Sequence, residues 1–107
     1  MTTISKSATT LTLINTFKVA PDKQQALIDL LDRATEDVMC KQPGFISANI
    51  HRSLDGTKVA NYAQWRSKAD LEAMQKNPEA GVHMKEAAAL ADSFEPILYE
   101  VFNIHGG

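Results

Sequence analysis

The sequence predicts an α+β protein with a ferredoxin-like fold, in which two β-α-β units form one four-stranded antiparallel sheet. Four segments alternate apolar and polar residues as strands do, and the segments between them carry apolar residues at helical spacing. Their order along the chain is strand, helix, strand, strand, helix, strand. The chain has 107 residues, which is room for one domain with a modest core.

The first strand and helix are predicted as follows. TLTLINTFK (10–18) alternates, and one of its faces carries Leu11, Leu13, Asn15 and Phe17. Pro21 and Asp22 begin a helix, because proline fits the first helical turn and a carboxylate is favourable at the positive end of the helix dipole. Apolar residues recur at helical spacing up to Val38, and KQPG (41–44) ends the helix.

A β-hairpin is predicted next. FISANIHRS (45–53) and TKVANYAQW (57–65) have strand patterns. The pair Asp55-Gly56 between them can adopt the positive φ angles of a tight turn, so the two strands should be antiparallel neighbours.

The second helical region and the last strand complete the order. Ser67, followed three residues later by Asp70, predicts a helix N-cap. Pro78 interrupts this helix, and a second piece runs over 79–92. PILYEVFNI (96–104) alternates as the fourth strand. We therefore expect one domain over 10–104, between a flexible N-terminal arm (1–9) and a C-terminal tail (105–107).

The last strand is apolar on both of its faces. Leu98 and Phe102 lie on one face, and Ile97 and Tyr99 lie on the other. Helices can cover only one face of the sheet, so the other would expose an apolar patch of the kind that marks an interface. We therefore expect a two-fold homodimer whose sheets pack face to face.

Composition limits the partners that we expect. Lys plus Arg total 11 and Asp plus Glu total 13, which gives a net charge of −2 and no electrostatic preference for nucleic acid. No apolar run approaches the roughly 20 residues of a membrane helix, and the N-terminus has no apolar leader. The single cysteine excludes an internal disulfide. These features predict a cytoplasmic protein with neither nucleic-acid nor membrane partners.

Motifs for metals and nucleotides are missing from the sequence. The glycines form no phosphate-binding array. The histidines His51, His83 and His105 are scattered, and with one cysteine they form no zinc-binding spacing. We expect no metal site and no nucleotide-dependent reaction.

The third strand carries the candidate site. In VANYAQWRS (59–67), Val59, Asn61, Ala63 and Trp65 share one face, which should point inwards because it is mostly apolar. A buried amide must find a hydrogen-bond partner or cost a few kcal/mol. Two interpretations follow. Either Asn61 bonds to backbone and Trp65 fills the core, or both line an apolar pocket with a few placed polar groups.

Residues 45–71, FISANIHRSLDGTKVANYAQWRSKADL, resemble the antibiotic biosynthesis monooxygenase superfamily, and within it the small cofactor-free anthrone monooxygenases. The resemblance implies a dimeric α/β barrel that oxidises an anthrone, a quinol or a related polycyclic phenol to a quinone with O₂ and no cofactor. The electron-rich anion of such a substrate can reduce O₂ itself, so the protein only has to bind the ring, favour the anion and manage a peroxide.

The resemblance also implies roles for individual residues. Asn61 would hydrogen-bond the developing oxyanion, and Trp65 would stack on the substrate and contact the oxygen species through its indole N–H. His51 would carry protons in the pocket. Lys85 stands near the family's arginine, and Leu71 stands where the family has an aromatic residue; both are expected to bind substrate.

Tyr62 and His83 complete the expected substrate-binding set. The position of His51 depends on the hairpin. If Asp55 and Gly56 are the two central residues of the loop, His51 pairs with Ala60 and lies off the Asn61 face, whereas a loop one residue longer brings it onto that face.

Two other functions stay open at this point. The superfamily also contains haem-degrading enzymes, in which an Asn, a Trp and a helical His as axial ligand form the site, and His83 would be that ligand here. The second alternative is a non-catalytic dimer that binds a small molecule, with Asn61 in a structural role.

Overall fold

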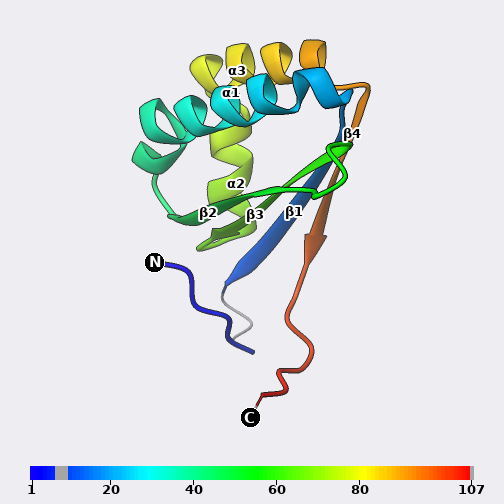
Figure 1. The fold of residues 1–107 in the computed structure, drawn as a ribbon. Helices are drawn as coiled ribbons and strands as arrows, with labels where there is room; N and C mark the ends of the chain where they lie inside the picture. The colour runs from blue at the N-terminus through cyan, green and yellow to red at the C-terminus, as the bar shows by residue number, and fades with distance from the viewer. Residues whose placement is uncertain (7–9, 107) are drawn as a thin grey trace.

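The structure is a computed structural model that describes residues 1–6 and 10–106. Its strands are β1 (Leu11–Lys18), β2 (Phe45–Arg52), β3 (Lys58–Trp65) and β4 (Ser93–Tyr99). Its helices are α1 (Gln24–Asp37), α2 (Lys68–Gln75) and α3 (Pro78–Leu90), with short 3₁₀ turns η1 (Pro21–Lys23) and η2 (Met39–Lys41). This order confirms the ferredoxin-like α+β prediction (Figure 1).

The sheet is antiparallel throughout and has the order β2-β3-β1-β4. The predicted hairpin of β2 and β3 therefore lies beside β1, while β4 forms the opposite edge. Helices α1 and α3 run side by side over one face (Figure 1). This face is called the inner face below, and the other is the outer face.

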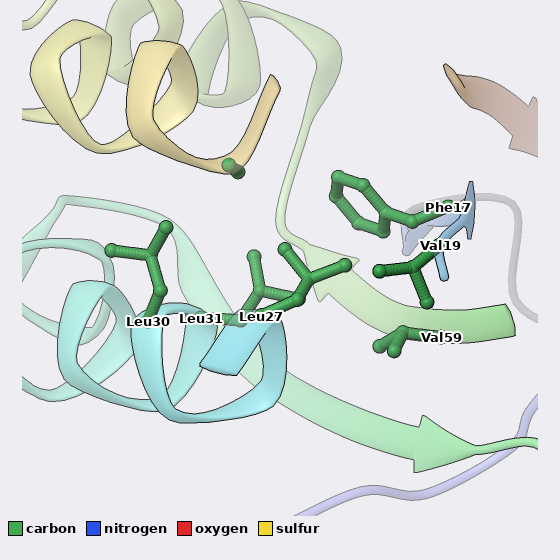
Figure 2. Packing of buried hydrophobic residues seen from close by; sticks show 7 residues of the cluster. Phe17, Val19, Leu27, Leu30, Leu31 and Val59 are labelled. Atoms are coloured by element: carbon green, nitrogen blue, oxygen red, sulfur yellow. The ribbon is translucent and has the colours of Figure 1, made fainter. Parts of the chain in front are cut away.

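The core lies between the inner face and the helices. One buried cluster joins α1 to β1, β3 and α3, and consists of Phe17, Val19, Leu27, Leu30, Leu31, Val59 and Ala87. Figure 2 shows Leu27 and Leu31 of α1 pointing toward Val19 and Val59, while Leu30 lies farther along the helix. A second cluster surrounds Trp65 and consists of Val38, Ala63, Trp65, Leu71, Met74 and Ala80. The inward faces predicted by the strand alternation and the helical apolar stripe are confirmed.

The predicted bounds of the last strand, 96–104, are wrong. Strand β4 begins at Ser93, just after the backbone N–H of Asp92 donates to the carbonyl of Lys18 (2.7 Å). It ends at Tyr99, which pairs with Thr12 at the far end of β1. Residues 100–106 form no strand and run away from the sheet (Figure 1).

The hairpin has the register in which His51 pairs with Ala60, one of the two alternatives that the sequence left open, but its turn is wider than two residues. The backbone N–H of Ser53 donates to the carbonyl of Lys58, so four residues lie between them. Gly56 has a positive φ of 81°, and Asp55 does not. The Asp55 carboxylate instead accepts hydrogen bonds from the hydroxyl and backbone N–H of Thr57 and from the hydroxyl of Ser53, which lower its pKa to about 2. These contacts fix the loop from within.

The N-terminal residues lie against the outer face. The hydroxyl of Thr2 donates to Asn49 Oδ1 (2.7 Å), and Gln64 Nε2 donates to the carbonyl of Thr3 (2.7 Å). Gln64 is 2% exposed. Residues 7–9 of the expected arm and Gly107 of the expected tail lie outside the described residues.

Candidate active site

A cavity of about 360 Å³ lies between the inner face of the sheet and the helices. All four strands contribute to one wall, and α1, η2, α2 and α3 contribute to the other. The size falls in the range of small-molecule pockets. Most of its lining is aliphatic, aromatic or thioether, and the polar exceptions are Asn15, Thr35, Asn61, Gln75 and His83. Within the described residues, no charged carboxylate, lysine or arginine lines it.

Two asparagines face each other on the sheet wall. Asn15 of β1 and Asn61 of β3 are direct cross-strand partners, a relation that brings Cβ atoms to within about 5.5 Å. The Oδ1 atom of each is buried, and neither has a hydrogen-bond partner among the described residues. A buried polar atom left unpaired costs about 1–3 kcal/mol. The backbone partner that the first interpretation requires for Asn61 is not found, so the geometry agrees with the pocket interpretation.

Trp65 forms the end of the same wall. Its side chain is 2% exposed and packs edge-to-face on Phe45, with ring centroids 5.6 Å apart and planes at 86°. It lines the cavity and also belongs to the buried cluster. Trp65 therefore both fills the core and presents part of its ring to the cavity.

A compact network holds the chain just after Trp65. The backbone N–H of Arg66 donates to the carbonyl of Gly44 (2.7 Å). The Asp70 carboxylate accepts from Arg66 Nε (2.8 Å), Arg66 Nη2 (2.9 Å) and the Ser67 hydroxyl (2.8 Å), and the Arg66 bonds in particular lower its pKa. Ser67 in turn accepts from the Asp70 backbone N–H, which confirms the predicted N-cap. The carboxylate lies so close to Gly44 that a Cβ there would overlap it.

The helical wall places one histidine at the cavity. His83 lies on α3 between Ala80 and Ala87, two residues that are almost completely buried against the rest of the protein. Its Nδ1 atom is buried and has no hydrogen-bond partner among the described residues. His83 thus faces the same space as the two asparagines.

His51 lies outside the cavity, and its expected position in the pocket is wrong. It pairs with Ala60, so its side chain is on the outer face, where it is exposed and its Nδ1 lies 2.9 Å from the carbonyl of Asn49. The hairpin register sets this face, and a separate irregularity lies at the start of β2. The register shifts by one residue between Phe45 and Ser47, so Ile46 is an extra residue that β3 does not match.

Three further predicted site residues do not line the cavity. Tyr62 alternates with Asn61 and lies on the outer face. Lys85 is exposed on α3, and Leu71 is buried in the cluster around Trp65. The structure therefore brings together Asn61, Trp65 and His83, and leaves the others apart.

Asn15 was not predicted as a site residue, although its sequence pattern pointed to one. In TLTLINTFK, Asn15 is a lone amide on an apolar strand face, which is the same pattern that singled out Asn61. Met39, Met74 and Met84, which line the helical wall, carried no comparable signal because methionine at helical spacing is ordinary core composition.

The fold and the cavity together define a class of protein. Its members have a ferredoxin-like fold and an apolar cavity between the sheet and the helices, and a few amide and imidazole groups line that cavity. Residues 10–88 match the family described as antibiotic biosynthesis monooxygenase. The chain belongs to the antibiotic biosynthesis monooxygenase family, and is an oxidoreductase.

Individual relatives agree with this assignment. The tetracenomycin-F1 monooxygenase of Streptomyces glaucescens is 45% identical over 106 residues, which cover 99% of this chain and 94% of the relative. A monooxygenase from the gene ActVA-Orf6 of Streptomyces coelicolor, in complex with nanaomycin D, is 25% identical with a TM-score of 0.81 and 91% coverage of both chains. SnoaB of Streptomyces nogalater, at 22% identity, has a TM-score of 0.75 over 91% of this chain and 97% of its own.

Within the described residues, no helix combines the length and hydropathy needed to cross a membrane. No group of three or more His, Cys, Asp or Glu residues in that part of the chain is arranged to hold a metal ion.

Proposed function

We propose that this protein is a cofactor-independent monooxygenase that converts an anthrone, or a related polycyclic phenol or quinol, to a quinone with O₂. One observation carries the proposal: Asn15 and Asn61 present unpartnered amides side by side in an apolar cavity. An amide holds both an acceptor oxygen and an N–H donor. The pair can therefore accept from a phenol O–H and, after the amides turn, donate to the oxyanion that replaces it.

The asparagine pair would stabilise the anion on which this chemistry depends. Loss of a proton from the CH₂ of an anthrone gives an enolate, whose negative charge rests largely on oxygen. Fixed donors that face such an oxyanion in an apolar site stabilise it far more than water does. The enolate carbon transfers electrons to O₂ and forms a C–O bond, giving a hydroperoxide. Loss of the second C–H proton with O–O cleavage then gives C=O and water, so CH₂ plus O₂ becomes C=O plus H₂O.

The relatives support a small organic substrate. The name of the S. glaucescens relative gives tetracenomycin F1 as its substrate, and the S. coelicolor protein was crystallised with nanaomycin D. The apolar lining of the cavity here suits a flat aromatic ring system, with Trp65 and Phe45 available at its edge.

The test is oxygen labelling. Chelator-treated protein and 1,8-dihydroxyanthrone are incubated under ¹⁸O₂, and the quinone is analysed by mass spectrometry after subtraction of the uncatalysed oxidation. We expect one ¹⁸O atom in each quinone formed, since the second atom leaves as water. Turnover that appears only after addition of a flavin, a metal or haem would contradict cofactor independence. No turnover above background on any anthrone or phenol would favour non-catalytic binding instead.

Haem binding is a second candidate, and the position of His83 favours it. An unpartnered imidazole nitrogen in an apolar cavity is a suitable axial ligand. The absence of lysine and arginine from the described lining argues against it, because the haem propionates would find no cation there. Titration with haemin separates the two proposals: a Soret band that is lost in His83→Ala would establish haem binding.

We also propose that the protein forms a homodimer. Ile97 and Tyr99 on the outer face of β4 are 38% and 45% exposed, and Phe102 and Ile104 beyond the strand are also exposed. A second copy would remove this apolar surface from water.

Light scattering should give about twice the 11.8 kDa of one chain, and Ile97→Glu should shift the mass to the monomer. The matched control is Leu54→Glu, in the hairpin loop, where Leu54 is already fully exposed. A wild-type monomer at micromolar concentration would contradict the proposal.

A further inference from the structure

We propose that His83 is the base that takes the proton from the reacting carbon of the substrate and returns it to the oxygen leaving as water. The inference rests on the proposed function and assigns a residue to the step that the two asparagines cannot perform. An amide stabilises an oxyanion, but it is not a base at neutral pH. A reaction that begins with loss of a proton needs an acceptor within reach of the substrate.

His83 is the only titratable side chain among the described residues that line the cavity. The strands contribute amide, aliphatic and aromatic groups to the lining, and α1, η2 and α2 contribute aliphatic, thioether, hydroxyl and amide groups. No Asp, Glu, Lys, Arg, Cys or Tyr side chain shares the cavity with the imidazole in the described part of the chain. A proton that leaves the substrate inside the cavity therefore has one side chain to accept it.

The state of the imidazole fits this role. Its Nδ1 atom is buried and unpaired, whereas His51 on the outer face has its Nδ1 beside the carbonyl of Asn49. A neutral imidazole has one acceptor nitrogen, and imidazole is the side chain that normally changes protonation between pH 5 and 8. Because Nδ1 has no hydrogen-bond partner among the described residues, no internal hydrogen bond has to break before it accepts a proton.

The two polar groups stand on different walls. Asn15 and Asn61 belong to the sheet, and His83 belongs to α3. A ring that lies between the walls can hold its oxygen at the amide pair while its reacting carbon meets the imidazole. His83 then takes the first C–H proton and gives it to the peroxide oxygen. It takes the second C–H proton as the O–O bond breaks and passes it to the departing hydroxide, which leaves as water, so the imidazole ends each cycle neutral.

The experiment compares His83→Gln with His51→Gln in oxygen uptake on 1,8-dihydroxyanthrone, after thermal unfolding has shown that both variants are folded. We expect His83→Gln to lower kcat by about 100-fold or more with KM nearly unchanged, and His51→Gln to retain wild-type turnover.

Chemical rescue provides a second readout. In His83→Ala the deleted side chain leaves space for free imidazole, which should restore a measurable part of the lost rate in a concentration-dependent way. Wild-type turnover together with a full kcat in His83→Gln would overturn the role of His83 and leave the proposed function standing. A raised KM with an unchanged kcat would also overturn it, because His83 would then only bind the ring. A wild-type protein without turnover would instead overturn the proposed function.

Discussion

Replacing Asn61 with alanine is expected to lower kcat/KM on a hydroxyanthrone by about 100- to 1000-fold, the usual effect of deleting one oxyanion donor. The same change should leave the free energy of unfolding unaltered, or raise it by about 1 kcal/mol, because the deleted Oδ1 is buried without a partner. Loss of activity without loss of stability distinguishes a site that serves the substrate from one that serves the fold. Steady-state kinetics and urea unfolding of the same preparation measure both quantities.

Asn15→Ala should behave in the same way, and the double variant tests whether the two amides hold one oxygen. If they do, the double variant should lose less than the two single effects combined, with a coupling free energy of about 0.5–3 kcal/mol. Strict additivity would mean that they contact different atoms.

Asn49→Ala is the matched control: this outer-face amide donates to the carbonyl of Tyr62 (3.0 Å), so its loss should lower stability and leave turnover intact. An Asn61→Ala variant with full turnover would remove the asparagine pair from the mechanism.

Gly44→Ala is expected to lower the free energy of unfolding by about 3 kcal/mol. A φ of 82° costs an alanine about 1–2 kcal/mol. In addition, the new Cβ would overlap the Asp70 carboxylate and displace it from Arg66 and Ser67. Loss of the hydrogen bonds of the carboxylate adds about 1 kcal/mol. Urea unfolding monitored by Trp65 fluorescence measures the change directly, since Trp65 is the only tryptophan.

Gly81→Ala is the control for this prediction, and its expected effect has the opposite sign. Gly81 lies within α3, has no positive φ, and a Cβ there would meet nothing within 4 Å. Alanine favours a helix over glycine by up to about 1 kcal/mol, so this variant should be slightly more stable. Equal destabilisation by both substitutions would show that the Asp70 network contributes nothing to the sensitivity of Gly44.

The elements that follow from local pattern were predictable from the sequence. Alternation in β1 and β3 identified the strands and their inner faces, and the apolar stripe of α1 identified the helix. The end of β4 was not predictable in this way. The pattern continues past Tyr99, but a strand requires a paired neighbour, and the pairing of β4 with β1 stops at Tyr99 and Thr12.

The candidate site was predictable only in part, for a related reason. Asn61 and Trp65 follow from the alternation of β3 alone. In contrast, α3 carries small or apolar residues on several of its sides, among them the alanines 87–89, so its sequence does not show which side faces the sheet. The structure resolves this through the burial of Ala80 and Ala87. That orientation places His83 at the cavity and leaves Lys85 in solvent.

The extra residue in β2 has a consequence for comparing this protein with its relatives. In a regular strand Phe45 and His51, six positions apart, would share a face. Ile46 reverses that relation, so Phe45 faces the cavity while His51 faces outwards. When a relative is aligned from the hairpin, its residue at the start of the strand is therefore equivalent to Phe45 only if its strand carries the same insertion. In this strand a one-residue gap in an alignment exchanges inside for outside, and it can alter the inferred chemistry more than any single substitution.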